Sequence, residues 1–342
     1  MKTLGYGKPM NLSREWPFVS IVIVTCNHRN FLEQCLKSVL STDYPNYEII
    51  VVDNGSNDGS VEMVERMIKD HCELKLIKNV SNLGHSFGVN IGVEKARGEY
   101  FAKLDDDTLV SPKWLQELMK VLMADPTIGV AQSGSYYYEG AELRPQPAYA
   151  ASLDYLGQIH FRHVESTQEV FHPTMYACVM KKSLFRQVGE LYPEYFIYYD
   201  EVDLGWRLRL LGYKCVVVPS SAVRHKGPLK GVNPVFQFHH IKNHLLTVIL
   251  NYELRNLVIY LPLIIGLRIV EGFYGLAKRR DPKTIFYVTK ALLWNLVNFR
   301  RTYARRKFVN QKLRHFPDKY IKKSMVKPYI ERSHHAHYDL KK

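Results

Sequence analysis

Short apolar runs recur along the first part of the chain, with segments of helical periodicity between them. Each run is continuous rather than alternating, which is typical of a strand buried on both faces. The runs are Ser20–Thr25, Glu48–Asp53, Leu74–Ile77, Tyr100–Leu104 and Ile128–Gln132. Apolar residues spaced three and four apart predict helices at Phe31–Leu40, Val61–Ile68 and Trp114–Leu122. Strands and helices in this order predict a mostly parallel sheet with helices on both faces, and therefore an α/β fold.

The pattern changes beyond this sheet. Residues 133–173 are rich in Tyr, Pro and His without a clear period, which predicts a loop with short strands. Further strands are predicted at Thr174–Lys182 and Lys214–Val218, and further helices near Ser183–Val188 and at Glu201–Leu211. From His239 the pattern is helical, with amphipathic segments near 239–277 and 283–312. We expect an N-terminal extension at 1–17, an α/β domain at 18–235 and a helical region at 236–342.

Polar clusters follow three of the predicted strands, at Thr25–Asn27, Asp53–Ser56 and Asp105–Asp107. In parallel sheets, ligands bind beyond the carboxyl ends of the strands. Like charges about 4 Å apart repel by roughly 4 kcal/mol at an effective dielectric near 20, so a divalent cation would relieve the triple aspartate. Oxygen ligands favour Mg²⁺ or Mn²⁺. The alternatives are a solvated acidic turn at Asp105–Asp107 and an Asx-turn at Asp53.

A second acidic cluster, Asp200, Glu201 and Asp203, opens the helix predicted at Glu201–Leu211. Acids in a first helical turn are stabilised by the helix dipole, which explains one of the three better than all three. The preceding residues, Phe196–Tyr199, supply an apolar wall, which we expect to raise a carboxyl pKa toward the range of a general base. Helix capping is the alternative.

Charge is distributed unevenly along the chain. The 47 Lys and Arg against 33 Asp and Glu give a net charge of +14. From Arg224 onward there are 25 basic and 6 acidic residues, a net of +19, so residues 1–223 hold the other 22 and 27, a net of −5. Such a basic segment predicts a polyanionic partner, either a membrane surface or nucleic acid. The five scattered Cys residues predict a reducing compartment, and the start of the chain does not resemble a signal peptide.

The helical region has features of a membrane interface. The apolar segment Phe286–Phe299 is followed by a basic cluster, and Trp294, Phe299 and Tyr303 are suited to the interface. The basic cluster consists of Arg300, Arg301, Arg305, Arg306 and Lys307. The longest uncharged apolar run, Leu257–Leu267, has 11 residues, so we expect no spanning helix. A helical bundle packed on the α/β domain is the alternative to lipid contact.

Four motifs in consistent order resemble a family 2 glycosyltransferase, and they cover about residues 17–230. The motifs are SIVIVTCNHRNFLEQCLKSVLSTDYPNYEIIVVDNGSNDGS, NLGHSFGVNIG, GEYFAKLDDDT and FIYYDEVDLGWRLRLLGYKCVVVPSSAVRHKG. The resemblance implies the GT-A fold, a Rossmann-like nucleotide-diphospho-sugar transferase fold, and an inverting mechanism. It is strongest to rhamnosyltransferase-like members, and it makes residues 18–235 the catalytic domain.

The same resemblance implies roles for the donor-side residues. Asp53 would meet the nucleotide base, and Thr25 and Asn27 would line the nucleotide pocket. Further residues would contact the nucleotide and sugar, namely Asn82, Gly84, Asn90 and the triple aspartate Asp105, Asp106 and Asp107. The outer acids form a D-x-D motif in which Asp107 is the metal ligand and Asp105 lies nearer the ribose while sharing the metal. His225 falls where some members supply a third ligand, although a basic loop residue is the alternative.

The resemblance places the catalytic base at Glu201, with Asp200 as a rival because the family often has the reverse order, Glu-Asp. The implied reaction transfers a sugar from a nucleotide-diphospho-sugar donor to a hydroxyl of a glycan or lipid-linked glycan, with Mg²⁺ or Mn²⁺. The expected location is cytoplasmic, peripheral on an anionic membrane surface at the inner face of the cell membrane. The loop at 133–173, with Tyr136, Tyr137 and Tyr138, is a candidate for shaping the acceptor side, and core or surface tyrosines are the alternative.

Three other functions agree with parts of the sequence and disagree with others. A sugar-phosphate nucleotidyltransferase needs a Gly-rich basic loop after the first strand, where this chain has TCNHRN. A processive polysaccharide synthase would carry a Q-x-x-R-W motif and several spanning helices, and neither is found. A nucleic-acid binder would suit the basic tail but not the carboxylate-lined crevice, so no nucleic acid partner is expected.

Overall fold

The computed structural model describes residues 16–137, 148–225, 234–280 and 282–328, and its centre is a nine-stranded mixed sheet. Four neighbouring strands are parallel, in the order β3 (Leu74–Asn79), β2 (Tyr47–Asn54), β1 (Val19–Thr25) and β4 (Tyr100–Asp105). The sheet continues through β10 (Ala177–Lys181), β6 (Ile128–Tyr137), β11 (Lys214–His225) and β5 (Thr108–Val110), while β9 (Gln168–Val170) pairs with β11. The parallel half matches the continuous apolar runs, because both of its faces are covered.

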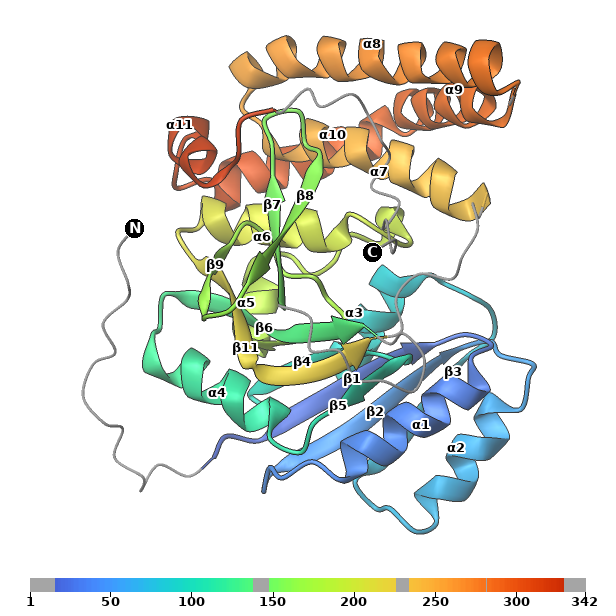
Figure 1. Cartoon of the computed structure of the whole chain (residues 1–342), viewed down its shortest axis with the longest axis vertical. Coiled ribbons are helices and arrows are strands. Elements are labelled where there is room, and N and C mark those ends of the chain that lie inside the picture. The colour runs from blue at the N-terminus through green and yellow to red at the C-terminus, as the bar shows by residue number, and fades with distance from the viewer. Residues whose placement is uncertain (1–15, 138–147, 226–233, 281, 329–342) are drawn as a thin grey trace.

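Helices cover the two faces of the sheet (Figure 1). One face packs against α1 (Arg29–Leu40), α2 (Ser60–Ile68) and α4 (Trp114–Ala124). The other packs against α3 (His85–Lys95), α5 (Lys182–Gln187) and α6 (Asp200–Leu210). Successive β1 residues divide between the two cores, Ile21 and Ile23 into one and Val22 into the other. This alternation explains why β1 has no polar face.

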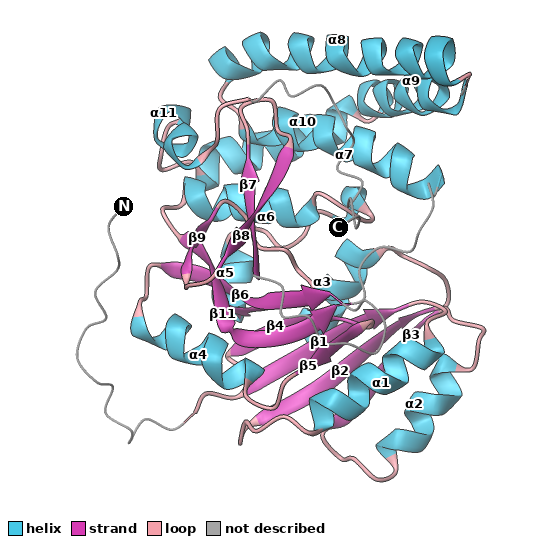
Figure 2. Cartoon of the chain, in the orientation of Figure 1, coloured by secondary structure: helices cyan, strands magenta, loops and turns pink. Residues whose placement is uncertain are grey.

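The C-terminal helices form a further layer on α6 (Figures 1 and 2). They are α7 (Pro234–Asn251), α8 (Leu254–Arg279), α9 (Pro282–Val297), α10 (Phe299–Phe308), a π-helical turn at Val309–Leu313, α11 (Asp318–Ile321) and a 3₁₀ turn at Lys322–Ser324. Trp206 of α6 is fully buried in the core shared with this layer, where it meets Tyr252 edge to face. A β7–β8 hairpin (Ala148–Leu153 and Ile159–Val164) and a 3₁₀ turn at Pro193–Tyr195 complete the fold. Helix α6 is therefore held between the sheet and the C-terminal helices.

The α/β fold expected from the sequence is confirmed, and the differences lie in particular elements. Helix α3 was not predicted, because its glycines break the apolar pattern. A Cβ on Gly92 would lie 2.3 Å from Val22 Cγ1, so the glycine allows α3 to approach β1 closely. The helical segment 239–277 divides near Tyr252 into α7 and α8. The strand predicted at Ile128–Gln132 is β6, which continues to Tyr137 and so into the expected loop, while Tyr138 lies outside the described residues.

Helix α8 extends on both sides of the uncharged apolar run Leu257–Leu267. It runs as one helix through Pro262, Arg268 and Glu271. By length and composition, Leu254–Lys278 is the one segment of the described chain long and apolar enough to cross a membrane. The expectation of no spanning helix stays a prediction.

Candidate functional site

Three parallel strands bring their polar ends to one edge of the sheet. In the register of the sheet, Thr25 at the end of β1 pairs with Asp53 of β2, and Val24 pairs with Asp105 at the end of β4. Parallel pairing places carboxyl ends side by side, which is the edge where α/β sheets bind ligands. The structure therefore brings together the three polar clusters that the sequence predicted.

The middle acid of the triple aspartate binds protein groups. Thr25 Oγ1 donates to Asp106 Oδ2 at 2.6 Å, and His28 Nδ1 lies 3.1 Å from the same oxygen. Asp106 is 8% exposed and joins the turn after β4 to the loop after β1. Its predicted contact with the donor stays a prediction, and its observed role is to hold these two loops together.

The outer acids converge with the end of β11. His225 Nε2 lies 3.4 Å from Asp105 Oδ2 and 3.2 Å from Asp107 Oδ1, and the ligand atoms of the three residues are all within 4.8 Å of one another. Lys103 forms an ion pair with the other oxygen of Asp105. The ring of Tyr176 stacks on His225 with 5.3 Å between centroids. These contacts fix the orientation of the cluster.

The pKa shifts of Asp105 and His225 show that this cluster favours a positively charged group. Burial raises the pKa of Asp105, but the charges of Lys103 and His225 outweigh it and hold the pKa far below its usual value. Burial lowers the pKa of His225, while hydrogen bonds to Asp105 and Asp107 raise it to about 9. The carboxylates thus already hold a cationic group between them. Two carboxylates and one imidazole are a donor set that fits a divalent metal ion such as Mn²⁺.

Asp53 lies at the end of β2 with one oxygen in use. The backbone N–H of Ser56 donates to Asp53 Oδ2 at 2.9 Å, as in the Asx-turn weighed from the sequence. Asp53 Oδ1 is buried and has no hydrogen-bond partner among the described residues. A buried carboxylate oxygen without a donor is costly, and a ligand N–H or O–H would satisfy it.

Asn27 shapes the loop beside Asp53. Its backbone has a φ of 57°, its N–H donates to Ser56 Oγ at 2.8 Å, and its Oδ1 accepts from the N–H of Asn57 at 2.8 Å. The loops after β1 and β2 are therefore tied together around Asn27. The expected contact of Asn27 with a nucleotide stays a prediction.

The segment before α3 is built around a glycine. Asn82 Oδ1 accepts from the N–H of Gly84 at 2.9 Å. Gly84 has a φ of +86°, and a Cβ there would lie 2.5 Å from the ring of Phe196. Asn90 is engaged on both sides of its amide by the backbone of Leu191, at 2.7 and 3.1 Å. These contacts give all three residues structural roles, and their predicted donor contacts stay predictions.

Asp200 and Glu201, the acidic pair at the start of α6, have pKa values shifted in opposite directions by their surroundings. Asp200 is 2% exposed and accepts hydrogen bonds from His85 Nδ1 at 2.8 Å and Ser86 Oγ at 2.9 Å. Despite burial, the charge and hydrogen bond of His85 hold the pKa of Asp200 well below its usual value. Burial and the adjacent Asp200 charge raise the pKa of Glu201 well above its usual value. Two adjacent carboxylates with separated pKa values are suited to acid–base chemistry, and the assignment of the base to Glu201, with Asp200 as the rival, stays a prediction.

The two acidic groups lie within electrostatic range of each other. The charge of His85, which contacts Asp200, also lowers the pKa of Asp105. The charge of Lys103, which pairs with Asp105, opposes the rise in the pKa of Glu201. The D-x-D turn and the α6 acids are therefore close enough for their charges to interact.

A strained loop presents the α6 acids. Phe196, Tyr198 and Tyr199 have φ values of 65°, 67° and 67°, a conformation that costs of order 1–3 kcal/mol each for such residues. The buried Asn243 of α7 holds this loop, because its Nδ2 donates to the carbonyls of Tyr195, Ile197 and Tyr198 at 2.9, 2.7 and 2.7 Å. The loop conformation is thus maintained by the C-terminal helices.

Sequence reasoning did not single out several of these residues. Lys103 carried a signal, since it is an isolated charge inside the apolar run before the triple aspartate. His85 and Ser86 lay in a recognised motif without an assigned role. Nothing in the local sequence distinguishes Tyr176 or Asn243, because each acts on residues far away in the chain.

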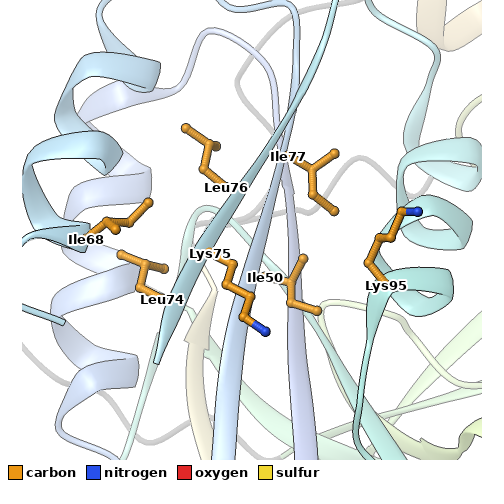
Figure 3. Close-up of a pocket in the computed structure, with 7 residues that line it drawn as sticks. All are labelled: Ile50, Ile68, Leu74, Lys75, Leu76, Ile77 and Lys95. Atoms are coloured by element: carbon orange, nitrogen blue, oxygen red, sulfur yellow. The ribbon is translucent and has the colours of Figure 1, made fainter. Parts of the chain in front are cut away.

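A surface hollow of about 400 Å³ beside edge strand β3 contains none of the predicted site residues (Figure 3). Its lining consists of Ile50, Ile68, Leu74, Lys75, Leu76, Ile77 and Lys95. The lining is aliphatic apart from two lysines and contains no carboxylate, so it lacks the acids needed for metal binding or proton transfer.

Comparison with known proteins agrees with this geometry. Residues 20–189 match the family model described as "Glycosyl transferase family 2". An uncharacterized glycosyltransferase of Haemophilus influenzae is 32% identical over 120 residues, which are 35% of this chain and 36% of that protein. A poly-beta-1,6-N-acetyl-D-glucosamine synthase of Staphylococcus epidermidis is 23% identical over 59% of this chain and 48% of its own length. The chain thus spans less than half the length of either relative.

Solved structures show the same fold. The mannosyltransferase PcManGT of Pyrobaculum calidifontis, in complex with GDP-Man and Mn²⁺, aligns with a TM-score of 0.55 at 19% identity and covers 82% of this chain and 87% of that chain. GalNAc-T7 with UDP, GalNAc and Mn²⁺ aligns with a TM-score of 0.63 at 18% identity, covering 82% and 57%. The GT-A fold expected from the sequence is confirmed. Through the domain that begins at β1, the chain belongs to glycosyl transferase family 2.

Proposed function

We propose that the protein is an inverting, metal-dependent glycosyltransferase that moves a sugar from a nucleotide-diphospho-sugar to a hydroxyl of a glycan or lipid-linked glycan. The observation that carries this proposal is the pairing of two sites in one region. Asp105, Asp107 and His225 form a group suited to a divalent cation, and Glu201 has a raised pKa close by.

The two α6 acids act on the acceptor, and other residues act on the donor. Glu201 accepts the proton of the acceptor hydroxyl, whose oxygen then bonds to the anomeric carbon as the bond to the diphosphate breaks. Attack from the side opposite the leaving group inverts the anomeric centre. Asp200 stays ionised because His85 and Ser86 hold it, and its charge keeps Glu201 basic.

On the donor side, Asp53 would accept a hydrogen bond from the nucleotide base, and the absence of a partner for its buried Oδ1 among the described residues supports this role. Asp107, Asp105 and His225 would hold the cation, which when bound neutralises the diphosphate leaving group. An imidazole ligand suits Mn²⁺ better than Mg²⁺, which prefers oxygen donors. We therefore favour Mn²⁺, in keeping with the Mn²⁺ of the two solved structures.

We infer that the enzyme works in the cytoplasm at the inner face of the membrane. The net charge of +19 from Arg224 onward supports this location, because anionic headgroups attract such a segment. The processive synthase is the second candidate, favoured by the Staphylococcus epidermidis relative. Analysis of product length distinguishes the two, since a processive enzyme releases long chains and a simple transferase adds one sugar.

A donor screen tests the proposed function. Thermal unfolding is followed with UDP-, GDP- and dTDP-sugars, each with Mn²⁺, with Mg²⁺ or with chelator. One nucleotide is expected to raise Tm only with metal present, and Asp53→Ala should lose that rise. Release of the matching nucleoside diphosphate on adding glycan acceptors then shows transfer. The proposal fails if no donor stabilises the protein under any metal condition.

A further inference from the structure

The outward face of α8 is apolar for most of its length. Its most exposed residues between the two helix ends are 44–65% exposed, and they are Val258, Ile259, Leu263, Leu267, Val270, Phe273, Tyr274 and Leu276. Helix α8 forms the layer farthest from the sheet (Figure 1). An apolar face of this size on a surface helix indicates a binding surface.

The two charged residues in the middle of α8 lie on the side of the helix away from the apolar face. Within 256–277, Arg268 and Glu271 are the charged residues, and they form an ion pair at 2.8 Å. Arg268 is 8% exposed and contacts Nδ1 of His244 on α7 at 3.0 Å. His244 in turn contacts the carbonyl of Leu156 at 2.7 Å. A helix in water normally has its polar residues outside, so α8 has the polarity of a helix that faces lipid.

Helix α9 continues the apolar surface and adds positive charge. It lies alongside α8, with Ile285 against Gly272. Its exposed apolar residues are Phe286, Leu293, Leu296 and Val297, and Phe299 and Tyr303 extend the series into α10. Exposed basic residues accompany them at Lys278, Lys290, Arg300 and Lys307. Residues 254–317 contain two acidic residues, Glu271 and Asp281, against 14 basic residues, so this segment complements an anionic surface.

We propose that the outward face of α8, together with the exposed apolar residues of α9 and α10, docks on a bilayer containing anionic lipids, with α8 lying in the plane of the interface. This inference deepens the membrane location proposed above and rests on it, but it is independent of the glycosyl transfer reaction.

The packing of α8 explains why it lies in the plane. Ile264 is 1% exposed and Arg268 is held against α7. A spanning α8 would have to leave α7 and carry Arg268 and Glu271 into hydrocarbon, where charged side chains are costly. In the plane, Arg268 stays buried against α7 with the partly exposed Glu271 beside it, and the apolar face enters the lipid.

Vesicle flotation of the full chain tests the proposal. We expect binding to phosphatidylcholine vesicles that contain phosphatidylglycerol, and much weaker binding to phosphatidylcholine alone or in high salt. The double variant V258E/L267E should lose at least tenfold in vesicle affinity. Phe161→Glu is the matched control, because it places a charge at an exposed apolar position on β8. Equal binding by the double variant and the control would overturn the proposal.

Two further measurements separate the alternatives. Alkaline carbonate should release the bound protein, and resistance to extraction would overturn the in-plane arrangement in favour of a spanning helix. In sedimentation velocity without vesicles, wild type and V258E/L267E should have the same oligomeric state. A wild-type dimer that V258E/L267E abolishes would instead assign this face to a second copy of the chain. Metal-dependent nucleotide binding should be unchanged in V258E/L267E, so a failure of the proposed reaction and a failure of membrane docking give different results.

Discussion

His85 Nδ1 lies 2.8 Å from Oδ2 of Asp200, so the start of α3 is joined to the start of α6 across 115 positions of the sequence. Ser86 adds a second donor to the same oxygen at 2.9 Å. His85 and Ser86 therefore hold Asp200 in its ionised form. Together with burial, the negative charge of Asp200 raises the pKa of the adjacent Glu201.

The first prediction concerns the identity of the base. Glu201→Gln should lower the rate of transfer about 10²–10⁴-fold, because the amide cannot accept the proton of the acceptor hydroxyl. Calorimetric affinity for the nucleoside diphosphate with Mn²⁺ should stay unchanged. Asp200→Asn should have the smaller effect on rate. A dead Asp200→Asn enzyme beside an active Glu201→Gln enzyme would reverse the assignment.

The pH dependence gives a separate prediction. Glu201 accepts a proton only when ionised, so kcat should rise with pH through a limb whose midpoint lies well above the ordinary glutamate value of 4.5. In Asp200→Asn the neighbouring negative charge is gone, so the limb should move to lower pH. The measurement is kcat against pH at saturating donor for both proteins. A limb that Asp200→Asn leaves in place would show that another group controls it.

Metal binding should depend on the outer acids of the triple aspartate. Asp107→Ala should weaken Mn²⁺-dependent nucleotide binding at least tenfold, since a lost charged ligand contact is worth about 1.5–3 kcal/mol. His225→Ala should reduce the preference for Mn²⁺ over Mg²⁺, because only oxygen ligands remain. Calorimetry with and without metal measures both effects. Asp125→Ala, at a remote and partly exposed site, is the control. Unaltered binding by Asp107→Ala would remove its metal role.

The sequence predicted the sheet and the edge where the site lies, because buried parallel strands leave a strong apolar pattern and end in polar residues. It did not predict that Asp106 binds protein groups while Asp105 and Asp107 lie beside His225. Asp106 turns to Thr25 and His28 only because the β1 and β4 ends are adjacent in the fold. Such contacts join residues about 80 positions apart and have no local signal.

The C-terminal helices show a second limit of prediction from sequence. The apolar residues of α8 resemble those of a buried core helix, and only the structure shows that many of them face outward while Arg268 faces inward. Periodicity indicates that a helix has two faces. Which face is buried depends on its neighbour, here the His244 side of α7.

Asn243 should act as a positioning residue for the base. Asn243→Ala removes the donor shared by three loop carbonyls, so the strained loop before Asp200 loses its support. We expect kcat to fall about tenfold or more, equivalent to about 1.4 kcal/mol, while nucleotide–metal affinity is retained. Asn256→Ala, which removes an amide from the contact with Asp318, is the control. Equal losses in kcat and in thermal stability for both variants would indicate a merely structural role.

The last prediction concerns acid stability and Glu48, a fully buried carboxylate at the start of β2. Burial raises its pKa, but Lys75 Nζ at 2.7 Å, Ser20 Oγ at 2.7 Å and the backbone and side chain of Arg97 outweigh this and lower the pKa to about 2. The ionised form therefore stabilises the fold at pH values above the ordinary 4.5, by about 3 kcal/mol, and this contribution is lost as pH falls from about 4.5 to 2.

Glu48→Gln should remove that pH-dependent term. In urea unfolding at a series of pH values, the free energy of unfolding of the variant should be lower than wild type at neutral pH and should approach it as the pH falls through this window. Glu94→Gln, on the exposed face of α3, should follow the wild-type curve. A constant difference between Glu48→Gln and wild type across the window would mean that the carboxylate acts through packing and not through its charge.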